Sequence, residues 1–494
     1  MAAFSWTLTG RMRIALFVAG CVALLLPLWI VRYPPLLDYP NHLASSYVLA
    51  HLRDPQVHFS QLYRADWALS PYVATDATLV MLQRFLPVEL AGRILLSICV
   101  LAFPLSVMFF ARQVQAQRDL TVLWAFVLTY NIFFLVGFLQ YCLSIAGCFA
   151  VLGLWLQYLD RPNILRWLGL LAAVVALYTL HLFGFAVAGL VITVYVCVKR
   201  PPIRQVFLSL LAFVPGLFLI LRSETGAKTA HHIIFGSLTR KLGWLVTWLE
   251  VHPKPNEPVN LVVFALFVIF LVALVWENTA SRWNRDWIKV AAVLFAMYWL
   301  LPGRYERGSD AFGDIDNRML PFAFIMILAA ADIGRRRRWF AAVAIIIFVI
   351  RMGSLTQEFV VEQPRLAQFA RSLEVVPVNA RVLPMTPPGV RIVSFLFEPI
   401  HFWGYGVIRR GWVSPYLFSI QGAQTLRLRD EPYPPLGAWT DEALDWERLR
   451  KMYDYVWSYH LPYLWPELHS MGELVFADGD LEVFKIRSNL SLRK

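Results

Sequence analysis

The feature that most constrains this chain is a series of apolar segments, each close to the length that crosses a lipid bilayer. A transmembrane helix needs about 20 apolar residues, because it rises about 1.5 Å per residue through about 30 Å of hydrocarbon. Such segments are Ile14–Val31, Leu120–Phe138, Ile164–Val198 (long enough for two passes), Asn260–Trp276 and Trp339–Ile350. With 58% hydrophobic residues and a mean hydropathy of +0.56, the 494-residue chain has too few polar residues to cover a water-soluble fold. The sequence therefore predicts a polytopic membrane protein.

The basic residues predict how the chain crosses the membrane. The net charge is +12, from 45 Lys and Arg against 33 Asp and Glu. Much of the excess lies in short segments between apolar runs, such as Arg335–Arg338, and the positive-inside rule explains that pattern better than a nucleic-acid partner does. Arg11 and Arg13 precede the first apolar run and predict a cytoplasmic N-terminus. No small-residue cleavage site follows that run, so we expect a retained first span.

Three longer segments of mixed charge separate these short basic segments. They are residues 32–87, 222–259 and 302–318. We expect all three on the periplasmic face of a bacterial inner membrane. Counting the crossings gives about eleven transmembrane helices within a membrane domain of residues 1–352.

The chain changes character after this domain, and residues 353–494 predict a small α/β domain on the periplasmic face. The predicted elements are a helix at Gln357–Leu373, strands at Arg381–Met385 and Asp454–Tyr459, and a hairpin that joins Glu473–Phe476 to Leu481–Ile486. Aromatic and basic residues gather between His401 and Trp412. We expect that stretch to dock the domain onto the membrane part, although such residues also suit glycan binding.

The first long loop places an acidic residue directly after the first span. The prolines at 34 and 35 favour an extended approach, and Pro40 with Asn41 favours a helix start. This geometry aims Asp38 at a cavity near the bilayer surface, where a carboxylate can act as general base toward an acceptor hydroxyl. His42 would orient that carboxylate or contact a phosphate. The alternative is that Asp38 only caps the helix that follows.

This arrangement resembles the GT-C superfamily of membrane glycosyltransferases. The resemblance rests on the many spans, the external C-terminal domain and the stretch Asp38-Tyr39-Pro40-Asn41-His42-Leu43, which is similar to one in bacterial members. It implies a GT-C-like fold, a polyprenyl-phosphate-linked sugar donor and a catalytic role for Asp38. Tyr39 stands where several members carry a second acidic residue.

Cations in the long loops are candidates for binding the donor phosphate. A phosphate at headgroup level needs positive charge both in the ground state and as it departs. The alternative for each cation is attachment to lipid headgroups. The predicted phosphate ligands are Arg222, Lys228, Arg304, Arg307 and Arg318.

Other polar residues of the loops are candidates for substrate binding. Carboxylates suit sugar hydroxyls, imidazoles suit phosphate, and an ionisable residue at the end of a span is a functional candidate. These candidates are His42, Arg53, His181, His231, His232, Asp310 and Asp316. Asp314 and Asp316 together have carboxylates that suit a divalent cation. No Cys/His cluster has zinc spacing, and the five cysteines lie in apolar segments. Apart from that acidic pair, the sequence therefore predicts no metal site, and it predicts no disulfide framework in the exported parts.

The predicted activity is sugar transfer on the periplasmic face by a single inverting displacement. Asp38 removes a proton from the acceptor, which is a glycan, a lipid or a protein, and the enzyme works among membrane lipids. Three alternatives stay open. One is a lipid or polysaccharide transporter or flippase that uses the same cavity. Another is a non-catalytic scaffold whose periplasmic domain binds a partner, and a third is an enzyme that transfers a whole glycan or another lipid-linked group.

Overall fold

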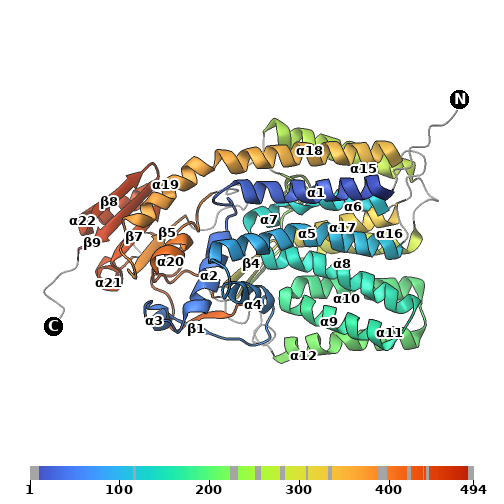
Figure 1. Ribbon diagram of the computed structural model, residues 1–494, viewed down its shortest axis with the longest axis horizontal. Helices are drawn as coiled ribbons and strands as arrows, with labels where there is room; N and C mark the ends of the chain where they lie inside the picture. Colours follow the sequence, from blue (N-terminus) through green and yellow to red (C-terminus); the bar gives the residue numbers. More distant parts are fainter. Residues whose placement is uncertain are drawn as a thin grey trace.

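Helices that run along the longest axis of the molecule form most of the structure, and a smaller region with strands lies at one end (Figure 1). The computed structural model describes residues 10–114, 118–222, 232–250, 257–278, 284–307, 310–331, 337–387, 398–419, 424–437, 439–440 and 444–487.

The helical part has the segments expected of a membrane bundle. Within the described ranges, seven helical segments are long and apolar enough to cross a membrane, and four shorter apolar ones accompany them. The long segments are α1 (Gly10–Ile30), α5 (Val88–Val114), α8 (Leu139–Asp160), α10 (Leu182–Lys199), α11 with η1 and α12 (Ile203–Arg222), α15 (Pro258–Glu277) and α18 (Arg337–Val361). Between them lie α6 (Arg118–Thr129), α7 (Ile132–Val136), α9 (Ile164–Leu180), α16 (Arg285–Leu300) and, after η2 (Asn317–Met319), α17 (Leu320–Ala330). The predicted helical membrane fold is confirmed.

Two breaks between these helices shape the end of the bundle that faces the strand-containing region. The long run that was predicted to make two passes is interrupted at His181, whose Nδ1 accepts a hydrogen bond from the Phe183 backbone N–H. The run at 120–138 is not one helix. The Asn131 side chain caps the short α7, and Gly137, at φ +97°, ends it in a left-handed conformation that favours glycine. This turn directs residues 136 and 137 toward the start of the first long loop.

The first long loop contains α2 (Tyr39–His51), α3 (Phe59–Leu62), β1 (Tyr63–Ala65) and α4 (Val73–Leu82). Most of α2 is buried, because it lies between the membrane helices and the C-terminal region (Figure 1). On the membrane side, a side chain at Gly92 of α5 would overlap Tyr39 and Leu43, so glycine permits this close packing. The predicted helix start near Pro40 is therefore confirmed.

The C-terminal region is built on a four-stranded sheet. Its strand order is β5 (Val382–Met385), β7 (Tyr455–Tyr459), β9 (Leu481–Ile486) and β8 (Gly472–Asp478), with β5 parallel to β7 and the other pairs antiparallel. The predicted hairpin and the predicted buried strand are confirmed, since β8 pairs with β9 and β7 is buried throughout. The accompanying helices are α19 (Gln363–Glu374), α20 (Gly404–Arg410), α21 (Trp446–Met452) and α22 (Trp465–Met471).

The C-terminal region and the membrane helices are joined at several points. Helix α18 continues past residue 352 to Val361 and leads into α19 (Figure 1). Strand β1 of the first long loop pairs antiparallel with β6 (Leu426–Leu428). The Arg409 guanidinium of α20 binds Glu89 Oε1 of α5 at 2.7 and 2.9 Å, and it donates to the Tyr33 hydroxyl at 2.8 Å. The stretch from His401 to Trp412 thus docks the region onto the bundle.

A smaller sheet joins the second and third long loops. Strands β2 (His232–Ile234), β3 (Arg304–Arg307) and β4 (Asp310–Gly313) pair antiparallel in that order. Helix α14 (Leu238–Thr247) follows β2. The sheet brings the loops of two different predicted outside segments to the same end of the bundle.

The Arg409–Glu89 pair gives a stability prediction. Arg409→Met leaves a partly buried carboxylate without its guanidinium, and we expect it to cost about 1–3 kcal/mol of unfolding free energy. Arg371→Met is the matched control, because Arg371 is exposed and its pair with Asp478 is 3.6 Å long, so its loss is expected to cost less than about 1 kcal/mol. Thermal unfolding of the detergent-solubilised protein measures both. Equal midpoints for the two variants would contradict the docking role of Arg409.

Candidate functional site

Asp38 lies where the first long loop meets the turn after α7. Its backbone N–H donates to the Val136 carbonyl at 2.9 Å. A Cβ at Gly137 would lie 3.0 Å from both the backbone nitrogen and the Cβ of Asp38, so glycine allows this approach. The Asp38 side chain is only 14% exposed, and burial raises its pKa to about 7. With a pKa of about 7, the Asp38 carboxyl is present in both its protonated and its ionised form near neutral pH.

The carboxylate of Asp38 does not cap α2. Asp38 is the residue before the helix, but its side chain accepts no hydrogen bond from the first turn. A polar contact to this carboxylate comes from the C-terminal region, where His401 Nε2 lies 3.4 Å from Asp38 Oδ1. The capping alternative is therefore not supported by the contacts.

His401 was not predicted as a site residue. Burial lowers its pKa to about 4, so the imidazole is neutral at neutral pH. It packs edge-on against the Phe418 ring at a centroid distance of 5.4 Å. The sequence signal was the cluster of aromatic and basic residues around it, which predicted docking and could not indicate which loop residue it meets.

His42 lies beside this pair. Its imidazole packs edge-on against the same Phe418 ring at 4.9 Å, and its Nδ1 is 3.3 Å from Gln140 Nε2 of α8. Burial and, secondly, the neighbouring His401 lower the pKa of His42 to about 3, so this imidazole is also neutral. The structure thus places the predicted Asp38 and His42 together.

A second group of polar residues surrounds Arg318 of η2. We call Tyr72, Tyr141, His181 and Arg318 the Arg318 cluster. Arg318 Nη1 and the Tyr72 hydroxyl lie 3.3 and 3.2 Å from His181 Nε2, and the guanidinium packs over the Tyr141 ring at 5.3 Å. It also packs over the Phe138 ring at 5.0 Å. Among the described residues the buried Arg318 Nε has no hydrogen-bond partner.

The short link between α7 and α8 contacts both Asp38 and the Arg318 cluster. Gly137 contacts Asp38, and the following residue, Phe138, contacts Arg318. The predicted residues His181 and Arg318 contact each other, although they belong to different loops. Tyr72 and Tyr141 were not predicted, because tyrosines near a bilayer surface are equally typical of interfacial anchors.

The acidic residues of the third long loop form a separate network. Arg240 of α14 binds Asp314 and Asp316 at 3.0 Å each, and Lys241 lies 3.4 Å from Asp316. The Lys241 ammonium also donates to three carbonyls at the end of α16. Asp316 is fully buried. The network favours a structural role for these carboxylates, which hold the third loop against α14.

The described residues contain no group of three or more His, Cys, Asp and Glu side chains placed to hold a metal ion. Asp314 and Asp316, the pair whose spacing suits a divalent cation, bind Arg240 as described.

The other predicted site residues are exposed at separate places, have only their backbone described, or lie outside the described residues. Arg53 follows α2 and is exposed, Arg222 ends α12 and packs on Phe218 at 4.5 Å, and His232 and Arg304 lie exposed on neighbouring strands. Lys228 and His231 lie outside the described residues. Arg307 and Asp310 are opposite each other where β3 pairs with β4, and only their backbone is described.

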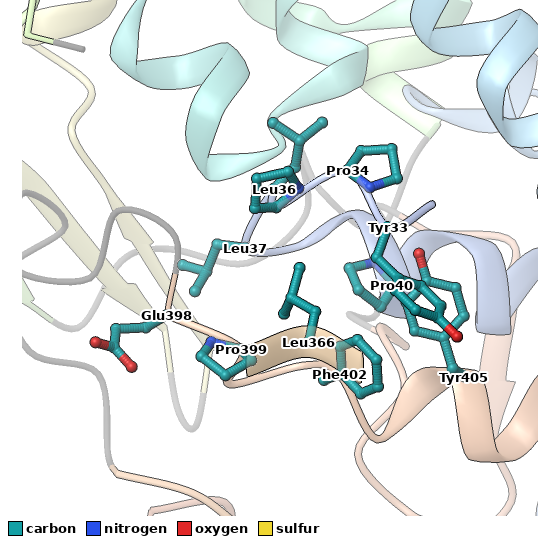
Figure 2. A pocket seen from close by; sticks show the side chains of 11 residues that line it. Tyr33, Pro34, Leu36, Leu37, Pro40, Leu366, Glu398, Pro399, Phe402 and Tyr405 are labelled. Carbon is teal, nitrogen blue, oxygen red and sulfur yellow. The ribbon is translucent and has the colours of Figure 1, made fainter. Parts of the chain in front are cut away.

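A small apolar pocket lies where residues 33–40 cross the C-terminal region. Figure 2 shows Leu36, Leu37 and Pro40 on one side and Leu366 with Phe402 on the other, with the Glu398 carboxylate turned away from them. That carboxylate binds Arg365 of α19 at 2.7 Å. Asp38 does not line this pocket. The pocket therefore marks the contact between the loop and the C-terminal region.

No family model matches the sequence, and no curated protein matches it. Among solved structures, the chain is similar to ArnT from Cupriavidus metallidurans bound to undecaprenyl phosphate. The TM-score is 0.55 at 12% sequence identity, and the match covers 97% of this chain and 98% of that one. ArnT from the same organism in the apo state gives a TM-score of 0.48 at 14% identity over 95% and 97% of the two chains. The chain therefore has the fold of ArnT over nearly its whole length, which is the GT-C type of fold that the sequence resemblance predicted.

Proposed function

We propose that this protein is a membrane glycosyltransferase that moves a sugar from a polyprenyl-phosphate donor to an acceptor hydroxyl. The observation that carries the proposal is the uncapped, buried carboxylate of Asp38, with a pKa near 7. The same end of the bundle holds Arg318, whose Nε–H has no partner among the described residues. The fold adds support, because the ArnT structure that it resembles is bound to undecaprenyl phosphate.

Asp38 serves as the general base. A base is most effective when its pKa lies near the working pH, and Asp38 meets this condition. Its carboxylate takes the proton from the acceptor O–H while that oxygen attacks the anomeric carbon. The bond between the anomeric carbon and the phosphate oxygen breaks, and the phosphate leaves with the electron pair. A single displacement of this kind inverts the configuration at the anomeric carbon.

The Arg318 cluster serves as the phosphate site. His181 Nδ1 accepts from the Phe183 N–H, so in the neutral imidazole the proton is on Nε2. Arg318 Nη1 also carries hydrogens, so its 3.3 Å contact with Nε2 joins two donors. An anionic oxygen between them would accept from both, and the unpaired Nε–H adds a further donor. The Phe138 and Tyr141 rings hold the guanidinium in place.

The transporter alternative has one observation in its favour, a charge buried within a span. Arg351 of α18 is 2% exposed. It donates to the Tyr130 carbonyl at 2.7 Å, just past the C-terminal end of α6, where the helix dipole favours a cation. This contact gives Arg351 a structural explanation. A transporter would not need the base at Asp38, so the first experiment below separates the two functions.

Asp38→Asn is expected to abolish sugar transfer, because an amide cannot accept the proton. We expect a fall in turnover of at least about 100-fold. The measurement uses purified protein in liposomes, a panel of undecaprenyl-phosphate-linked sugars and a bacterial lipid extract as acceptor. Asp66→Asn is the control, since Asp66 belongs to the same loop and its half-exposed carboxylate pairs with Arg427 at 3.5 Å. Full transfer by folded Asp38→Asn would exclude Asp38 as the base, whereas a native protein that transfers no sugar in this assay would favour a transporter or scaffold.

The pH dependence follows from the raised pKa of Asp38. Below about pH 7 the carboxyl is protonated and cannot accept a proton, so kcat/KM should fall about tenfold for each further pH unit. Above that pH it should reach a plateau. A profile that stays flat from pH 5 to 8, with the fold intact by circular dichroism, would contradict the assignment.

Arg318→Gln is expected to weaken binding of undecaprenyl phosphate by about 10-fold or more, since a hydrogen bond to a charged group contributes about 1.5–3 kcal/mol. Binding of undecaprenyl phosphate alone is measured in detergent, so the result does not depend on turnover. Arg84→Gln is the control, because Arg84 lies exposed just after α4. Equal affinities for both variants would place the phosphate elsewhere.

A further inference from the structure

We propose that His401 is a positioning residue that donates a hydrogen bond from Nε2 to the Asp38 carboxylate, and that Asn41 fixes the tautomer in which it does so. The inference rests on the function proposed above and deepens it. It assigns to the C-terminal region a direct part in the reaction, beyond docking.

The orientation of the Asn41 amide is set by backbone groups. Asn41 is fully buried. Its Oδ1 accepts from the Phe418 backbone N–H at 2.9 Å, and its Nδ2 donates to the Tyr416 carbonyl at 3.1 Å. A flipped amide would place Nδ2 against the Phe418 N–H, donor against donor, and Oδ1 against the Tyr416 carbonyl, acceptor against acceptor. The side-chain nitrogen of Asn41 is therefore the atom that faces His401.

This orientation decides where the proton of His401 lies. Asn41 Nδ2 is 3.4 Å from His401 Nδ1, and since Nδ2 is only a donor, Nδ1 must accept. The neutral imidazole then carries its proton on Nε2, which is the nitrogen 3.4 Å from Asp38 Oδ1. The low pKa of His401 keeps the ring neutral at working pH, so the 3.4 Å contact places an N–H, and not an imidazolium, against the carboxylate.

The consequence for Asp38 is both geometric and electrostatic. A donor on Oδ1 fixes the carboxylate plane and leaves Oδ2 for the acceptor hydroxyl. It also stabilises the ionised form and thus opposes the rise in pKa caused by burial. The other titratable group here is His42 of α2, which is neutral. Helix α7 contributes no titratable side chain. The first turn of α8 contributes Gln140, which does not titrate, and Tyr141, whose ring lies against Arg318.

The C-terminal region positions both His401, which belongs to it, and Asn41 of α2. Gly404 at the start of α20 packs on the Pro40 carbonyl, where a Cβ would lie only 2.6 Å away, and this contact sets His401 above α2. Tyr416 and Phe418 hold Asn41, and the Phe418 ring packs on His401 and His42. Asp38 thus has its partner only when the C-terminal region is docked.

The pH profile of kcat/KM for sugar transfer tests this inference. His401→Leu removes the donor, and we expect the apparent pKa of the profile to rise by one unit or more, with turnover reduced at pH 7 and recovering toward pH 9. His401→Gln retains an N–H donor and should keep the midpoint within half a unit of the native value. His460→Gln is the control, because His460 pairs with Asp480 at 3.2 Å at an exposed place in the same region.

The outcomes separate this inference from the proposed function. If Asp38→Asn is inactive while His401→Leu keeps the native midpoint, His401 is only a packing residue and the inference is wrong. A loss of turnover with no change of midpoint is the result of a purely structural role, and it also overturns the inference. If Asp38→Asn is fully active, Asp38 is not the base, and the proposed mechanism fails independently of His401. His401→Met, whose flexible side chain fills the same space, replaces His401→Leu if the leucine variant does not fold.

Discussion

The burial of one carboxylate is the constraint on which the site depends. Placing Asp38 against the turn after α7 removes water from the carboxylate, which costs free energy unless polar partners replace that water. The nearest partner is an imidazole from the far end of the chain. Burial accounts for the raised pKa of Asp38, and the proposed hydrogen bond from His401 to Oδ1 would limit that rise.

The C-terminal region has its own four-stranded sheet, and it also contributes His401 to the candidate site. Strand pairing between β1 and β6, the Arg409–Glu89 ion pair and the contacts of Gln363 with the Tyr33 backbone all join it to the first long loop and α5. Helix α2 is buried on both sides by this arrangement. A division of the chain near residue 352 follows the change in composition, whereas the contacts that hold Asp38 cross that division.

What could be predicted from the sequence was local. Apolar length identified the spans, and the polar residue His181 within a long apolar run marked a break between two helices. The prolines near Asp38 indicated the start of α2. These features depend on neighbours along the chain, so periodicity and length contain the information. The His401–Asp38 contact depends on how α20 packs against α2, which no local pattern specifies.

The loop cations show the same limit. Arg222, Arg304 and Arg318 all lie in charged loops near a span end, so the sequence pattern predicted all three equally as phosphate ligands. The structure distinguishes Arg318 by its aromatic neighbours and its buried Nε, whereas Arg222 is exposed beside one phenylalanine. Asp316 was predicted to meet sugar hydroxyls, and its buried pair with Arg240 could not be seen because Arg240 belongs to another loop.

The short link between α7 and α8 relates the proposed base, Asp38, to the proposed phosphate ligand, Arg318. Gly137 contacts Asp38 and Phe138 contacts Arg318, so two successive residues set the spacing of the two groups. A transfer reaction needs the nucleophile and the leaving group on opposite sides of one carbon, and errors of about 1 Å in such spacing slow reactions strongly. Asn131 caps α7 at its start and the left-handed Gly137 ends it, so the link has little freedom to move. The same glycine that permits the burial of Asp38 therefore also fixes its position relative to Arg318.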